Sequence, residues 1–104
     1  MFGLTSLYHV SLRENEESIL RSGVLASKSR GKRTGSYWVN EDMLVWAILH
    51  VSARHAVSVN EILIFVALMD TEEVEVQRTA RQGVFFVPDD VDVSYSMDIP
   101  LDVF

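Results

Sequence analysis

The segment Glu61–Met69, EILIFVALM, decides the fold of this chain. Successive side chains of a strand point to opposite faces, and in this segment both sets are apolar. One set is Ile62, Ile64, Val66 and Leu68, and the other is Leu63, Phe65 and Ala67. A strand that is apolar on both faces is buried on both, so we expect it at the centre of a sheet. Its apolar run is far shorter than the roughly 18 residues of a membrane span.

Five other segments have the composition of strands, with aromatic and β-branched residues or alternating apolar positions. They are Leu7–Val10, Ser36–Val39, residues 73–77, Val84–Val87 and Val91–Tyr95. A turn at Asp70-Thr71 separates the central strand from the third of these, and Pro88 ends the fourth. Val74 and Val76 alternate with polar residues, which predicts a half-buried strand. The sequence therefore predicts five or six strands.

Two helices are expected, both before the central strand. From Met43 to Val51, apolar residues recur at spacings of three and four, which predicts an amphipathic helix over about 41–55. Asn40 is in position to cap it. A shorter helix follows Asn15, with acidic residues in its first turn and Gly23 at its C-terminal end. Helices placed early and strands placed late favour an α+β fold over alternating β-α-β units.

Length and composition limit what this protein is. A chain of 104 residues that is 48% hydrophobic has room for one core, so residues 1–104 form a single domain. It contains no cysteine, which excludes disulfides and thiolate sites. The N-terminus lacks the profile of a signal peptide, and no membrane partner is expected. We therefore expect a cytoplasmic protein that is a monomer or a homodimer.

The net charge of −6 argues against a surface that binds nucleic acid along its whole extent. Its distribution is uneven, however. Six of the nine basic residues lie between Arg13 and Arg33, whereas the chain from Asp89 onward has five aspartates and no basic residue. This pattern is compatible with a local anion site.

The opening of the chain carries a recognisable motif. Tyr8-His9-Val10-Ser11 is followed by Asn15, then Ser18-Ile19-Leu20, then Gly23-Val24. This series resembles the start of small ADP-ribosyltransferase-like domains, which include bacterial toxins and tRNA 2′-phosphotransferases. Ser36–Val39, followed by the 41–55 helix, fits the aromatic strand that comes next in those domains. The resemblance covers the first half of the chain.

The resemblance implies an ADP-ribosyltransferase-like fold with two short early helices and a mostly antiparallel, split sheet of five to six strands. It also implies NAD as the substrate. His9 would then bond the adenosine-side ribose and Ser11 the nicotinamide ribose. Tyr37 or Trp38 would stack on the nicotinamide, since an aromatic face attracts a flat cation. Because the two residues alternate along a strand, only one of them faces the ligand.

Two further roles complete the site that the resemblance implies. Arg30, Lys32 and Arg33, in the basic loop Lys28–Gly35, are candidates to hold the pyrophosphate, because arginine binds phosphate oxygens bidentately and the loop glycines allow close approach of the backbone. Glu75 is the candidate catalytic carboxylate, which would stabilise the positive charge that develops as nicotinamide leaves. The reaction would transfer ADP-ribose to a macromolecular acceptor, either a protein or a nucleic acid.

Two alternatives stay open. A 2′-phosphotransferase-like enzyme would use His9 and several arginines, for which Arg13, Arg78 and Arg81 are available, to hold a phosphate at an RNA end. A protein-interaction module would keep the fold without the chemistry and would fill the cleft with side chains such as Trp38 or Phe85.

No metal site is expected. His50 and His55 are five positions apart, so they do not form the i, i+4 pair of a zinc-binding helix. His50 and Arg54 are one helical turn apart, and we expect them on the surface or at an interface.

Overall fold

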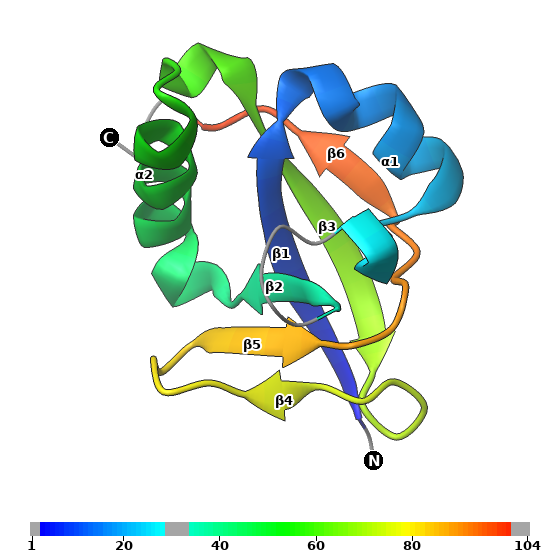
Figure 1. The fold of residues 1–104 in the computed structure, drawn as a ribbon. Helices are drawn as coiled ribbons and strands as arrows, with labels where there is room; N and C mark the ends of the chain where they lie inside the picture. The colour runs from blue at the N-terminus through cyan, green and yellow to red at the C-terminus, as the bar shows by residue number, and fades with distance from the viewer. Residues whose placement is uncertain (1–2, 29–33, 101–104) are drawn as a thin grey trace.

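The computed structural model describes residues 3–28 and 34–100 (Figure 1). Six strands and two α-helices occur in these residues, and four single turns of 3-10 helix, at Arg13–Asn15, Ala26–Lys28, Glu41–Met43 and Val59–Glu61, lie in the connections before β3. The strands are β1 (Leu4–Leu12), β2 (Ser36–Val39), β3 (Ile62–Asp70), β4 (Gln77–Arg78), β5 (Val84–Val87) and β6 (Tyr95–Met97). The helices are α1 (Glu16–Ser22) and α2 (Leu44–His55). The expected α+β class is confirmed.

The strands form one sheet in the order β4-β5-β2-β1-β3-β6, with every neighbouring pair antiparallel. β1 pairs with β3 along its whole length, whereas β1 and β2 share a single pair of opposing residues, Tyr8 and Val39. The sheet therefore consists of two halves joined at a narrow junction. Figure 1 shows β1 and β3 running steeply across the direction of β2 and β5.

Apolar side chains pack on both faces of this sheet, because successive residues of each strand alternate between faces. Ala47 and Ile48 of α2 pack on one face against Val10 of β1 and Ile64 of β3. Trp38 is at the centre of the cluster on the other face. Leu7, Val24, Ala67, Met69, Val87 and Val91 surround it. The predicted burial of β3 on both faces is confirmed, but β3 is second from the edge of the sheet, between β1 and the short β6.

The prediction of a strand at residues 73–77 is wrong for most of its length. The Asp70 carbonyl accepts hydrogen bonds from the backbone N–H groups of Glu73 and Val74, at 2.9 and 2.8 Å. The Asp70 side chain accepts the N–H of Glu72 at 2.9 Å. These local bonds compete with sheet pairing, as aspartate in a turn commonly does. Pairing therefore begins only at Gln77.

The last strand is also displaced from its predicted position at Val91–Tyr95. Val91 forms an isolated bridge with Val24, and regular pairing with β3 starts at Tyr95. The alternation of Val91 and Val93 reflects their packing in the Trp38 cluster rather than a ladder of hydrogen bonds. Within residues 3–28 and 34–100, no helix is long and apolar enough to cross a membrane.

Candidate functional site

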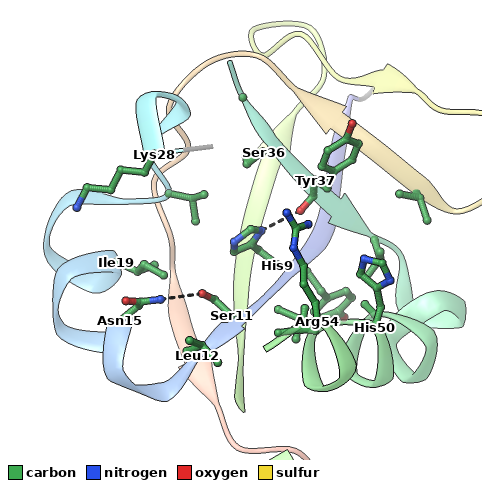
Figure 2. Close-up of a pocket in the computed structure, with 18 of the residues that line it drawn as sticks. His9, Ser11, Leu12, Asn15, Ile19, Lys28, Ser36, Tyr37, His50 and Arg54 are labelled. Atoms are coloured by element: carbon green, nitrogen blue, oxygen red, sulfur yellow. Dashed lines mark hydrogen bonds between the residues drawn. The ribbon is translucent and has the colours of Figure 1, made fainter. Parts of the chain in front are cut away.

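A cavity of about 750 Å³ opens at the junction between the two halves of the sheet. Its floor is formed by Tyr8–Leu12 of β1 and by residues 35–37 beside them, where β2 diverges from β1. Residues of α1 and of the segment that follows it line one side, and α2 lines the other. Figure 2 shows His9 between these two walls. The motif singled out in the sequence therefore lies at the bottom of this cavity.

His9 is fixed in orientation by the backbone. Its Nδ1 lies 2.8 Å from the carbonyl oxygen of Tyr37, and since a carbonyl only accepts, Nδ1 carries the proton. Burial lowers the pKa of His9 below 6.5, and this hydrogen bond, which favours the charged form, opposes the shift only in part. The neutral ring then presents the lone pair of Nε2. No described residue bonds this atom, and it is not enclosed, so it faces the cavity.

Ser11 lies two residues further along the same face of β1. The side-chain amide of Asn15 donates to the Ser11 hydroxyl oxygen at 3.2 Å (Figure 2). The Asn15 side chain makes no capping hydrogen bond to α1. With its oxygen already accepting a bond, Ser11 has its hydroxyl hydrogen available for a ligand. His9 and Ser11 thus present an acceptor and a donor in one cavity.

The charge of the lining is opposite to that of the protein. Among the described residues that line the cavity, the cations are Lys28, Arg54 and Arg81, and the only carboxylate belongs to Glu14. Arg54 projects from α2 into the cavity in Figure 2, and Lys28 lines the opposite edge. In a chain of net charge −6, this local excess of positive charge would favour an anion over a cation.

The two aromatic candidates of β2 have different environments. Tyr37 lines the cavity, is 52% exposed, and contacts Phe86 edge-on at 5.1 Å between ring centroids. Trp38 has no exposed surface, and its indole N–H donates to the Ser36 hydroxyl at 2.7 Å. Trp38 also packs against His9 at 5.2 Å between ring centroids. Of the two, Tyr37 is therefore the residue that a ligand can reach.

The remaining sequence candidates do not join this group. Arg30, Lys32 and Arg33 lie outside the described residues. Glu75 does not line the cavity: it precedes the outermost strand β4, where its carboxylate bonds the Gln77 side chain. The turn at Asp70 keeps this segment out of the sheet, and Glu75 is exposed between Val74 and Val76, which pack against the Trp38 cluster. Neither Trp38 nor Phe85 fills the cavity.

The arginines proposed for an RNA phosphate are dispersed. Arg13 bonds the carbonyl of Asn60 and the carboxylate of Asp98, at 3.0 and 2.6 Å, and does not line the cavity. The Asp98 carboxylate raises the pKa of Arg13. Arg78 lines a smaller hollow on the other side of the loop between β4 and β5. Of the three, only Arg81 lines the main cavity.

Sequence reasoning missed the contribution of α2. Trp46, His50 and Arg54 are spaced by four residues, so they form one stripe of the helix, and all three line the cavity. His50 and Arg54 are exposed, as expected, but their place in the lining of a cavity was not predicted. The spacing of these three residues was visible in the sequence. That α2 lies across a cavity from β1 was not, because the two elements are far apart in the chain.

Two further findings bear on the identity of the site. In the described part of the chain, no three histidine, aspartate or glutamate side chains are grouped so as to hold a metal ion. No known protein-family model matches this sequence, and no curated protein is significantly similar to it. The function is therefore argued from the cavity itself.

The lowered pKa of His9 predicts a dependence of stability on pH. The unfolded chain binds a proton on this histidine near pH 6.5, whereas the folded protein resists protonation until the pH is lower. The contribution of His9 to stability is thus complete above about pH 6.5 and is lost as the pH falls toward the folded pKa. The loss is at most about 1.4 kcal/mol per pH unit.

Chemical denaturation of the wild type and of His9→Gln, from pH 7.5 to 5, tests this prediction. We expect the wild type to lose more stability than the variant, which has no group to titrate at this position. Parallel curves for the two proteins would contradict the burial of a neutral His9.

Proposed function

We propose that the cavity binds a nucleotide of the NAD or ADP-ribose class and that the domain transfers ADP-ribose to a macromolecule. The observation that carries the proposal is the meeting of His9, Ser11 and Arg54 in one cavity of an acidic protein. A volume of about 750 Å³ is in the range of small-molecule sites. The resemblance of the opening motif to ADP-ribosyltransferase-like domains supports the same ligand class.

Each group suits a part of such a ligand. The lone pair of His9 Nε2 accepts a hydrogen bond from a ribose hydroxyl, and the Ser11 hydroxyl donates one. The Arg54 guanidinium matches the geometry of phosphate oxygens, with Lys28 at the opposite edge adding positive charge. The exposed ring of Tyr37 offers a face to a flat heterocycle.

The transfer step needs a carboxylate near the ribose. In that step the bond between nicotinamide and the ribose carbon breaks, nicotinamide leaves with the electron pair, and an acceptor atom bonds the carbon after losing its proton. Glu14 is the carboxylate that the described lining supplies, and it takes the role that the sequence suggested for Glu75. A negative group stabilises the positive charge that develops on the ribose.

A second candidate function is 2′-phosphotransferase-like chemistry at an RNA end. It is favoured by the ratio of three cationic side chains to one carboxylate in the described lining. It requires that a 2′-phosphorylated oligoribonucleotide react in the presence of NAD. The two candidates share the nucleotide site and differ in the acceptor.

Calorimetric titration of NAD and of ADP-ribose into the protein tests the shared site. We expect saturable binding that Arg54→Ala weakens by roughly tenfold or more, because a hydrogen bond to a charged group contributes about 1.5–3 kcal/mol. His9→Ala is expected to weaken binding by roughly threefold to tenfold, because a hydrogen bond between neutral groups contributes about 0.5–1.5 kcal/mol. Arg21→Ala is the matched control, since Arg21 is exposed on α1 and does not line the cavity.

Lack of binding by both nucleotides at millimolar concentration would contradict the proposal and would favour the interaction module. Where binding is seen, release of nicotinamide by the wild type but not by Glu14→Gln supports transfer. Loss of the 2′-phosphate from an RNA end, with NAD consumed, supports the second candidate instead.

A further inference from the structure

Three side chains from two distant segments stack at the rim of the cavity. The Trp46 and His50 rings are nearly parallel, with 17° between their planes and 5.1 Å between centroids. The Arg81 guanidinium lies over the Trp46 ring, 4.7 Å from its centroid. Trp46 and His50 come from α2, whereas Arg81 comes from the loop between β4 and β5. We call Arg81, Trp46 and His50 the rim stack.

The loop that carries Arg81 is ordered by its own hydrogen bonds. The Thr79 hydroxyl donates to the Val84 carbonyl at 2.7 Å and accepts the backbone N–H of Arg81 at 3.2 Å. The N–H of Val84 donates to the Arg81 carbonyl at 3.2 Å. These hydrogen bonds fix the backbone of the loop. The Arg81 side chain is held in addition by its contact with the Trp46 ring.

The rim stack is open to solvent. His50 and Arg81 are exposed, and Trp46 is half-buried. Arg54, one helical turn beyond His50, continues the stripe into the cavity. Among the described residues that line the cavity, Glu14 is the one carboxylate. The rim thus combines exposed ring surface with cationic groups beside the nucleotide site.

We propose that the rim stack binds the acceptor and that this acceptor is a single-stranded nucleic acid, an inference that rests on the proposed function. A base has a flat face that stacks on the His50 ring, and its phosphate has the charge that Arg81 attracts. An acidic peptide would use the cations but would have no use for two parallel aromatic rings. Because the positive charge is local, binding is confined to a short segment of strand.

Fluorescence anisotropy with short, labelled single-stranded RNA and DNA tests this inference. Two matched probes are an abasic strand of the same length and an acidic peptide of the same charge. We expect the intact strand to bind roughly tenfold more tightly than either, since one stacked base contributes that much or more. His50→Ala is expected to remove most of this difference, and Arg81→Gln to lower the dependence on salt by the contribution of about one phosphate.

The two variants are surface changes, so the fold is expected to be retained, and Arg21→Ala is again the control. Equal affinity for the intact strand, the abasic strand and the peptide would overturn the inference. NAD titration of the wild-type protein separates the two proposals, because the nucleotide is assigned to His9, Ser11 and Arg54 and the strand to the rim stack. If the strand fails to bind while NAD binds, only the acceptor is wrong; if both fail, the proposed function fails too.

Discussion

Replacing Trp38 with alanine is expected to lower the free energy of unfolding by about 3–5 kcal/mol, which is the usual cost of truncating a buried aromatic side chain. Trp38 has no exposed surface and is central to one of the two apolar clusters. A domain of this size has a total stability of only about 5–15 kcal/mol. The variant should therefore unfold at much lower denaturant concentration, which urea denaturation monitored by circular dichroism measures.

Trp38→Phe separates the volume of this side chain from its hydrogen bond. It retains most of the apolar contact but leaves the buried Ser36 hydroxyl without the 2.7 Å bond from the indole N–H. We expect a loss of about 1–3 kcal/mol, smaller than that of alanine. If Trp38→Ala unfolds at the same urea concentration as the wild type, the assignment of Trp38 to the core is wrong.

Replacing Gly23 with alanine is expected to destabilise the domain by at least about 2 kcal/mol and to weaken nucleotide binding. Gly23 has a φ of 82° and a ψ of −177°, a region that costs a residue with a Cβ about 1–3 kcal/mol. A Cβ at this position would also lie 2.5 Å from the Val91 carbonyl oxygen. That oxygen accepts the N–H of Val24 at 2.8 Å, so the clash displaces the bridge between these segments.

The effect on binding follows from what the bridge holds in place. Val24, Leu25 and Lys28 line the cavity, and the Ala26 N–H is fixed by the Asp90 carboxylate at 2.8 Å. Movement of Val24 therefore reshapes one wall of the site. Thermal unfolding and NAD titration of Gly23→Ala measure both effects. Ser22→Ala, at an exposed position next to it, should change neither, and equal melting temperatures for the two variants would refute the strain argument.

Local sequence signals were sufficient for most elements of the fold. The alternating apolar pattern of β3 and the spacing of apolar residues in α2 each depend on neighbours in the chain, so both elements could be predicted. The alternation of apolar and polar residues at 73–77 led to a wrong strand prediction. Val74 and Val76 do pack against the core, but regular pairing with a neighbouring strand begins only at Gln77. Apolar alternation reports burial, and it predicts pairing only where no local group satisfies the backbone.

The site was predictable only in part. His9 and Ser11 were identified from a motif on one strand, and the cavity contains both. The contribution of Arg54, Arg81 and Trp46 depends on which wall each segment forms, and Glu75 was misplaced for the same reason. Residues that meet from β1, α2 and the loop after β4 have no fixed spacing in the sequence.

The sequence by itself determined the α+β class, the burial of β3 on both faces and the early motif with His9 and Ser11, because periodicity and composition are properties of neighbouring residues. The tertiary structure alone decided that the sheet narrows at the Tyr8–Val39 pair and that a cavity opens there. It also decided that Trp38 is core and Tyr37 is exposed. These outcomes depend on how segments that are distant in the sequence pack against one another. Such packing is determined by contacts across the fold, and the pattern of residues within one segment does not encode it.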